Sequence, residues 1–466
     1  MVKFHTARAI ALGATMALAA VACGQYPNTH DLALRNGTAA AGSLGGAGLG
    51  GSNQTTLGTT TNGTVAGAGA TGGTTGGTRG TTQTNQTVNT NAPGHTTTGV
   101  TASTITIGIH APITGAAPVT DQSFEDGKDL YWKYGDNGKP ILVYGRHVNV
   151  IVEDDHYNPS YATLVCKQMV EQDHAFLLVG GAGTDQIVAC AKYAATQPGP
   201  VPYLSAGVTQ KWLEPYSNYF ALSMTYPQQV PLLVQYMKKR LGVTNPSQAA
   251  MVATNTANFD DAVEAWQKLM PGSDVYRPDK SDTSAPQSTS QQLCNGPLDK
   301  YKVVFPLVAP VFFLNMAGAA SCKPLFAGVG ITMGLDAVAQ VFCGEGYREA
   351  HFFSPASAFH DVGQANKQFM RAAQAKGVTP DDIMWLLWGL SGGLDELLTR
   401  AGPDLSRERF IQTTSTANVN GFGYYTSARY TPSNHFGATQ VNMLKLHCPT
   451  NNTGYWLTEA QDVTHF

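Results

Sequence analysis

The chain has 466 residues, of which 29 are lysine or arginine, 32 are aspartate or glutamate, and only 13% are charged. A net charge of −3 without a basic stripe argues against nucleic acid or an acidic membrane surface as a partner. The stretch from residue 101 onward is long enough for two lobes with separate hydrophobic cores.

Residues 1–22 have the layout of a secretory signal peptide. Lys3 and Arg8 precede an apolar run from Ala9 to Ala22, and small residues lead up to Cys23. The run is too short to span a bilayer comfortably, and no later stretch offers about 18 apolar residues in a row. We therefore expect an exported chain that no helix anchors in the membrane.

The residues before Cys23 resemble a bacterial lipobox, in which the cysteine is acylated and becomes the new N-terminus. Ala20 stands where leucine is usual, so ordinary cleavage to a free product remains the alternative. Residues 23–100 are rich in Gly, Thr, Asn and Ser and poor in charge and large apolar side chains, which predicts a disordered tether. These features predict a lipoprotein on the outer face of the cell membrane, with the lipid as its sole contact with the bilayer.

The next segment alternates strand and helix patterns. Alternating β-branched residues predict a strand over Thr104–His110, and a helix is expected over Phe124–Tyr134. Further strands are predicted at 147–153, 176–180, 201–205, 249–254 and 302–309, and helices follow Pro159, contain Cys190, and cover 228–241 and 260–269. Such βα units predict parallel sheets flanked by helices, and two series of them predict an α/β fold with two lobes and a ligand cleft between them.

Six cysteines remain once Cys23 is assigned to lipid, and an even number in an exported chain predicts disulfides. Six cysteines allow 15 connectivities. Proximity along the chain favours Cys166 with Cys190, Cys294 with Cys322, and Cys343 with Cys448.

A series of short motifs carries a family resemblance. They are Ile107–Gly115, Gly127, Tyr144–Arg146, Glu153–Asp155 with Asn158–Pro159, Leu178–Gly181, Val201–Ser205 and Tyr430–Gly437. Their order and spacing resemble the type I periplasmic binding proteins of the leucine/isoleucine/valine-binding branch, which serve ABC importers, over Thr104–Leu457. A disulfide between Cys166 and Cys190 also resembles one found among such proteins.

The resemblance implies a periplasmic-binding-protein-like fold with a hinge of three crossovers, near Met224, Ser354 and Ala428. Lobe 1 would comprise 101–224 plus 354–428, and lobe 2 would comprise 225–353 plus 429–466. The implied function is capture of a small molecule and its delivery to an ABC permease, without catalysis, cofactor or metal. A ligand-sensing surface receptor of the same fold without transport is the alternative.

In the family, loops at the carboxyl ends of lobe-1 strands hold the ligand's polar head. The matching loops here are Gly181–Thr184 and Ser205–Thr209, and the first of them opens a helix whose N–H groups can receive an anion. Turn formation and helix capping alone would also select glycine and threonine there. The candidate ligand-binding residues are Gly183, Thr184, Ser205, Gly207, Thr209, Phe124, Tyr226 and Phe259.

The sequence departs from amino-acid binders of this branch, which place acidic residues against the ligand's ammonium group. The matching stretches, Thr225–Tyr226 and Gly328–Thr332, contain no carboxylate. An unpaired ammonium group in a closed cleft is costly. The expected ligand is therefore an amino acid, an amide or a small carboxylate, with the last two at least as well favoured.

Two chemical readings compete with solute binding. Gly389–Gly393 matches the Gly-x-Ser-x-Gly elbow of serine hydrolases, with Ser391 as nucleophile and Asp404 and His435 following in order. Because the flanking residues predict helix on both sides, we expect Ser391 to lie where two helical stretches pack closely. Glu153–His156 could be read as a metal cluster, but adjacent acids after a strand more often cap a turn.

Overall fold

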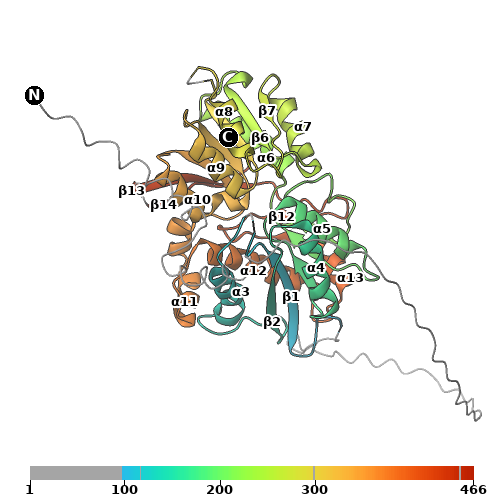
Figure 1. The fold of residues 1–466 in the computed structure, drawn as a ribbon. Coiled ribbons are helices and arrows are strands. Elements are labelled where there is room, and N and C mark those ends of the chain that lie inside the picture. Colours follow the sequence, from blue (N-terminus) through green and yellow to red (C-terminus); the bar gives the residue numbers. More distant parts are fainter. Residues whose placement is uncertain (1–96, 116, 298–299, 451–452) are drawn as a thin grey trace, which may run out of the picture. The chain divides into compact units, whose positions relative to one another are not determined.

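The computed structural model describes residues 97–115, 117–297, 300–450 and 453–466. These residues form two main sheets, one of five strands and one of seven, each flanked by helices (Figure 1). The expected signal peptide, the acylated Cys23 and nearly all of the expected tether lie outside the described residues.

The five-stranded sheet is parallel throughout, with strand order β2-β1-β3-β4-β5. Its strands are β1 (Thr104–Ala111), β2 (His147–Asp154), β3 (Leu177–Val179), β4 (Tyr203–Ser205) and β5 (Tyr219–Ala221). The helices of this part are α3 (Asp121–Tyr134), α4 (Pro159–Glu171), α5 (Thr184–Ala195), α11 (Lys367–Lys376), α12 (Asp382–Ala401) and α13 (Arg407–Thr414).

The two faces of this sheet belong to two different apolar clusters. Leu177 and Val179 pack in the cluster that contains residues of α12, whereas Leu178 between them packs with residues of α4 and α5. This alternation is the period-2 pattern of a strand buried on both faces. Figure 1 accordingly shows α3 and α12 on one side of β1 and β2, and α4 and α5 on the other.

The seven-stranded sheet has the order β14-β13-β10-β9-β8-β6-β7. Its strands are β6 (Ala249–Ala253), β7 (Asp274–Tyr276), β8 (Val303–Leu307), β9 (Leu325–Val329), β10 (Ala350–Ser354), β13 (Val441–Thr450) and β14 (Thr453–Val463). Its helices are α6 (Tyr226–Lys239), α7 (Asp260–Leu269), α8 (Ala285–Leu293), α9 (Pro310–Ala319) and α10 (Asp336–Gly344). Short elements complete the chain: η1 (Pro246–Gln248), η2 (Ala257–Phe259), η3 (Ile331–Gly334), η4 (Phe359–Gly363), β11 (Asn418–Val419) and β12 (Ala428–Arg429).

The predicted α/β class with parallel sheets flanked by helices is confirmed. One part of the topology differs from the alternating pattern, because β13 pairs antiparallel with β10 and β14 antiparallel with β13. These two long strands at the end of the chain form a hairpin on the seven-stranded sheet and add no βα unit.

In the described chain, three segments run between the two sheets: after β5, after β10 and after β12. Thr426 ties them together, because its hydroxyl donates to the carbonyl of Leu222 (3.2 Å) and its backbone N–H donates to the carbonyl of Pro355 (2.8 Å). The amide of Asn442 donates to the same Pro355 carbonyl (2.9 Å). The three segments therefore form one hydrogen-bonded bundle.

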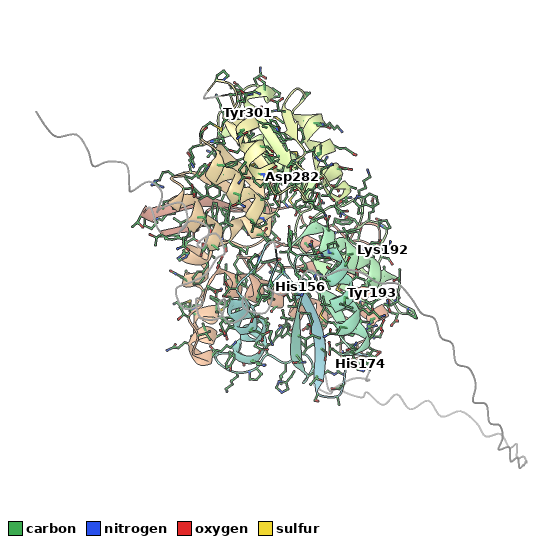
Figure 2. All side chains as sticks on the ribbon, viewed as in Figure 1. His156, His174, Lys192, Tyr193, Asp282 and Tyr301 are labelled. Atoms are coloured by element: carbon green, nitrogen blue, oxygen red, sulfur yellow. A yellow bond between two sulfur atoms is a disulfide. The ribbon has the colours of Figure 1, made fainter. Side chains whose placement is uncertain are left out.

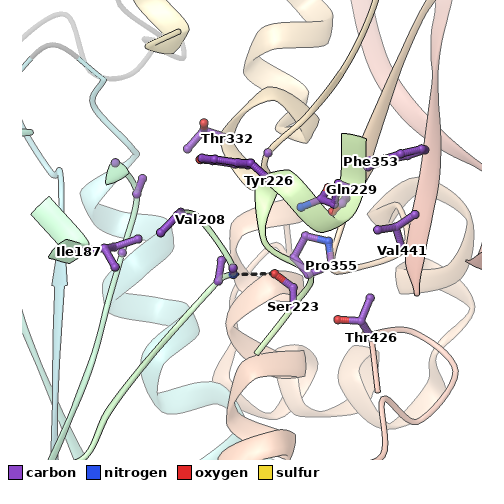
Figure 3. A pocket seen from close by; sticks show the side chains of 17 residues that line it. Ile187, Val208, Ser223, Tyr226, Gln229, Thr332, Phe353, Pro355, Thr426 and Val441 are labelled. Carbon is purple, nitrogen blue, oxygen red and sulfur yellow. Dashed lines mark hydrogen bonds between the residues drawn. The ribbon is translucent and has the colours of Figure 1, made fainter. Parts of the chain in front are cut away.

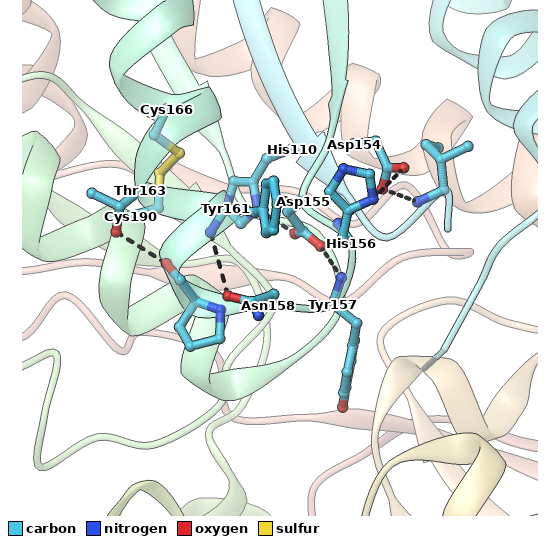
Figure 4. Close-up of polar contacts among 12 residues, drawn as sticks. His110, Asp154, Asp155, His156, Tyr157, Asn158, Tyr161, Thr163, Cys166 and Cys190 are labelled. Carbon is cyan, nitrogen blue, oxygen red and sulfur yellow. Dashed lines mark hydrogen bonds and ion pairs between the residues drawn. A yellow bond between two sulfur atoms is a disulfide. The ribbon is translucent and has the colours of Figure 1, made fainter. Parts of the chain in front are cut away.

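Three disulfides join described residues, and they are the three pairs that the sequence analysis favoured. Cys166 of α4 bonds Cys190 of α5, Cys294 bonds Cys322, and Cys343 of α10 bonds Cys448 of β13. Figure 4 shows the first pair together with the start of α4, where the side chain of Asn158 accepts the N–H of Ser160 (2.9 Å) and caps the helix.

Side chains cover both parts of the molecule, and a few labels locate them in Figure 2. Tyr301 and Asp282 lie on the part built on the seven-stranded sheet, whereas His156, Tyr193 and His174 lie on the part built on the five-stranded sheet. No helix in the described ranges has both the length and the apolar character needed to cross a bilayer.

Candidate ligand-binding site

A cavity opens where the carboxyl ends of strands from both sheets meet. From the five-stranded sheet it is lined by Gly181–Gly183 after β3 and Ala206–Val208 after β4, and from the other sheet by Gly330 and Thr332 after β9. The remaining lining residues, most of them visible in Figure 3, are Ile187, Ser223, Tyr226, Gln229, Phe353, Ser354, Pro355, Thr426 and Val441. We call this space the polar cavity.

The glycines of the first loop let the backbone approach closely. A Cβ on Gly181 would lie 2.2 Å from the carbonyl oxygen of His110, and Gly183 has φ +102°, a conformation that side chains disfavour. Gly183 is the N-cap residue of α5, and no side chain in the described chain caps that helix. The first N–H groups of α5 therefore suit a hydrogen-bond acceptor of a ligand in the polar cavity.

Several polar side chains of this cavity are held by internal hydrogen bonds. Ser223 accepts the N–H of Gly207 (2.9 Å, dashed in Figure 3), and Gln229 donates to the carbonyl of Met224 (2.6 Å). Burial raises the pKa of the Tyr226 phenol to about 12, so this side chain stays a neutral hydrogen-bonding group. The cavity thus offers fixed dipoles and hydroxyls.

A second space, which we call the apolar cavity, adjoins the polar cavity. The two share four lining residues, Gly181, Ala182, Ala206 and Thr332. The other residues of the apolar cavity are Ile109, Pro112, Val119, Phe124, Gly180, Leu335, Ile383, Leu386, Leu387, Leu390 and Tyr425. The space enclosed by these residues is about 690 Å³ when its opening to solvent is included.

No charged side chain is among the described residues that line either cavity. The nearby carboxylate of Asp185 has partners of its own: Asn258 donates to it at 2.6 Å and Lys280 lies 2.6 Å away. Burial would raise the pKa of Asp185, but these hydrogen bonds outweigh it and hold the pKa below the ordinary value. A ligand ammonium group would find no carboxylate in the lining.

Four of the eight candidate residues line a cavity. Gly183, Gly207 and Tyr226 line the polar cavity, and Phe124 lines the apolar cavity. Phe259 packs edge-on against the ring of Tyr226, with ring centroids 5.8 Å apart.

The other three candidates are polar residues whose hydroxyls have protein partners. Thr184 donates to the phenol oxygen of Tyr226 (3.3 Å), and Ser205 is bonded to the phenol of Tyr219 (2.8 Å). Thr209 is fully buried and donates to the carboxylate of Asp261 (2.8 Å). In this conformation these hydroxyls hold the walls of the site together.

The Thr209 contact belongs to a set that links the two parts of the molecule. Asp261 of α7 also accepts the N–H groups of Gln210 (2.7 Å) and Lys211 (3.2 Å). In the opposite direction, Asp185 of α5 binds Asn258 and Lys280 of the other part. Each part therefore supplies one carboxylate to donors of the other.

The residues of α12 that line the apolar cavity are not among the candidates predicted from the sequence. Ile383, Leu386, Leu387 and Leu390 recur at the spacing of one helix face, which is the available signal. Core packing produces the same pattern, so the sequence alone does not separate a cavity wall from a core.

The hydrolase reading conflicts with the structure. Ser391 is buried within α12, one continuous helix over Asp382–Ala401, where two packed helical stretches were expected. A nucleophile elbow requires a strand before the serine and a helix after it. His435, the expected base, donates its Nδ1–H to the Tyr219 carbonyl (3.0 Å) and stacks on Phe220.

Possible metal ligands gather at one buried place in the described chain, His110 with Cys166 and Cys190. The two sulfurs are bonded to each other and offer no thiolate, while the ring of His110 is held by Asp155 (2.7 Å) and Tyr203 (2.7 Å). Figure 4 shows this histidine between the disulfide and Asp155. In the predicted acidic stretch, Asp154 binds the N–H and hydroxyl of Thr114 and Asp155 binds the N–H of Tyr157, so these acids cap turns.

Comparison with known proteins agrees with this architecture. A family model described as periplasmic binding protein matches residues 104–447, and the chain belongs to that family. The family expected from the sequence motifs is thereby confirmed. A comparison with curated protein sequences gives no match.

Solved structures share the fold at low identity. A solute-binding protein of an ABC transporter from Rhodopseudomonas palustris, in complex with 4-hydroxybenzoate, has a TM-score of 0.61 and 16% identity, covering 78% of this chain and 98% of its own. The branched-chain amino acid transporter substrate-binding protein LivJ from Streptococcus pneumoniae, in complex with isoleucine, has a TM-score of 0.59 and 16% identity, covering 76% and 100%. At this identity the likeness establishes the fold.

Proposed function

We propose that this protein is an extracytoplasmic solute-binding protein that captures a small molecule in the polar and apolar cavities and delivers it to an ABC permease. The observation that carries the proposal is the site itself, which is lined from both sheets and enclosed by carboxylate contacts between them. Family membership supports it, and so do the related structures, which hold 4-hydroxybenzoate and isoleucine.

The two sheets with their helices act as lobes, divided as 101–224 plus 354–428 and 225–353 plus 429–466. Ligand docks while the lobes are apart, and rotation at the three connecting segments brings Asp261 to Thr209. The permease recognises the closed form. Cys23 carries the lipid that keeps the protein at the outer face of the cell membrane.

The ligand has a hydrogen-bonding head without an ammonium group. Gly183, Gly207 and Tyr226 surround the head, Phe124 contacts the apolar body, and Thr184, Ser205, Thr209 and Phe259 support these positions from behind. The support for this ligand class is the lack of any charged side chain among the described lining residues.

A thermal-shift screen of matched pairs tests the ligand class. Each carboxylate is compared with its α-amino derivative, for example 4-methylpentanoate with leucine, because a cleft binder gains stability by RT ln(1 + [L]/Kd). We expect the carboxylate of a pair to raise Tm and the amino acid to have no effect. A larger shift with leucine would contradict the assignment.

A further inference from the structure

We infer that the apolar cavity is a second compartment of the binding site, which receives the tail of an elongated ligand whose head lies in the polar cavity. The ligands are carboxylates with an extended apolar tail, such as medium-chain fatty acids and ring acids that bear an alkyl group. This inference rests on the proposed function and specifies its substrate class.

One helix supplies a whole wall of this compartment. Ile383, Leu386 and Leu390 lie on one face of α12 and all line the apolar cavity. The same cavity is also lined by Val119, which precedes α3, and by Phe124, which lies within α3. A wall of this kind contacts a hydrocarbon chain along its length and offers no group that would fix a second polar end.

The compartment is kept open by the packing around it. The ring of Tyr425 fits beside α12 because residue 389 is glycine: a Cβ there would lie 2.8 Å from Cδ2 of the ring. Leu386, Leu390 and Phe124 are only partly buried, although they face a space surrounded by apolar side chains. Apolar surface left in contact with water is unfavourable, and a hydrocarbon tail would remove it from water.

The two cavities adjoin at four shared lining residues, most of which have small side chains. Gly181, Ala182 and Ala206, which line both cavities, have at most a methyl group as side chain, and Thr332 is the fourth shared residue. A carboxylate at the start of α5 can therefore extend its tail past these residues. Short acids would fill the polar cavity and leave the leucines of α12 without a partner.

Titration calorimetry with butanoate, hexanoate, octanoate and decanoate tests the inference on the whole protein. Each methylene that enters an apolar compartment should improve Kd by about fourfold until the space is filled. Leu390→Trp, which narrows the compartment, should abolish this dependence on chain length, so that decanoate binds no more tightly than butanoate. The matched control is Leu164→Trp on α4, where the leucine is 58% exposed and outside both cavities.

A second variant tests the inference even if Leu390→Trp fails to fold. Leu386→Ala enlarges the compartment, so the chain length of best affinity should move to a longer acid. If all four acids bind the wild type with the same Kd, the tail compartment is overturned and solute capture stands. If none of the acids binds, both the compartment and the proposed ligand class are overturned.

Discussion

The hydroxyl of Thr209 and the carboxylate of Asp261, 2.8 Å apart, join the loop after β4 to the start of α7. The two residues belong to the parts built on different sheets, and 52 positions separate them in the chain, so their hydrogen bond requires the two parts to be in contact. The same carboxylate oxygen accepts two backbone N–H groups of that loop. These hydrogen bonds of the Asp261 side chain therefore form only when α7 lies against the loop after β4.

Removal of that carboxylate should weaken ligand binding more than it weakens folding. We expect Asp261→Ala to raise Kd by about tenfold or more, because hydrogen bonds to a charged group contribute about 1.5–3 kcal/mol each. The Tm of the ligand-free protein should change little. Calorimetry and thermal melts measure the two quantities.

Glu264→Ala is the control on the same helix, since Glu264 reaches Lys211 of the same loop at 3.6 Å while 67% exposed. An exposed ion pair contributes little, so its Kd should stay close to the wild-type value. In addition, Thr209→Val should have less effect in the Asp261→Ala background than alone. Equal losses from Asp261→Ala and Glu264→Ala would contradict the role given to Asp261.

Gly207→Ala should disrupt the wall of the polar cavity. A Cβ at this position would lie 2.2 Å from the carbonyl oxygen of Ser223 and 2.4 Å from the carbonyl carbon of Met224, both in a segment that connects the sheets. Because backbone atoms cannot move aside cheaply, we expect loss of ligand binding and a lowered Tm. Gly199→Ala is the comparison, since its Cβ would meet Glu408 at an ordinary 3.6 Å; a similar loss there would argue against a specific contact at Gly207.

Asp382 should make the protein less stable as pH rises. Burial raises the pKa of its carboxyl well above the ordinary value, and the neighbouring carboxyls of Asp336 and Asp381 add to the rise. The unfolded chain gives up this proton near pH 4, whereas the folded chain retains it, so the stability present at low pH is lost as pH rises towards the folded pKa.

Asp382→Asn should therefore raise Tm by a few degrees at pH 7 and leave it unchanged near pH 3.5. An amide oxygen can still accept the Asp336 N–H that Asp382 binds at 2.8 Å. Thermal melts of both proteins across this range provide the measurement. A Tm difference that stays constant with pH would rule out titration of Asp382 as its cause.

The disulfides should differ in their contributions to stability. Cys343 and Cys448 are 105 positions apart and Cys166 and Cys190 only 24. On the chain-entropy model their removal by paired alanine substitutions should cost about 5 and about 3 kcal/mol. Urea unfolding of the two double variants measures this order, and the reverse order would show that local packing around Cys166 outweighs loop length.

Much of the fold could be predicted from patterns of short range. The β-branched alternation of Thr104–His110 corresponds directly to β1, and Pro159 is the first residue of α4. The hairpin of β13 and β14 was not predicted. The predicted topology assumed alternating strands and helices, and this hairpin pairs two consecutive strands antiparallel without a helix between them.

The site was harder to predict than the fold because hydroxyl partners depend on tertiary contacts. Nothing near Thr209 in the sequence indicates that Asp261 would reach it, and nothing near Thr184 indicates the phenol of Tyr226. By contrast, the lack of a carboxylate at Thr225–Tyr226 could be predicted, because the residue types at these positions are read directly from the sequence.

The floor of the polar cavity is made by the connecting segments themselves, through Ser223, Pro355 and Thr426. A bound molecule would thus contact the segments about which we propose that the lobes rotate. We therefore expect that the size of a ligand decides whether its binding is followed by closure of the two lobes. A molecule slightly too large would remain bound against Thr426 yet keep Asp261 away from Thr209, and would act as an antagonist that fills the receptor without producing the form that a permease accepts.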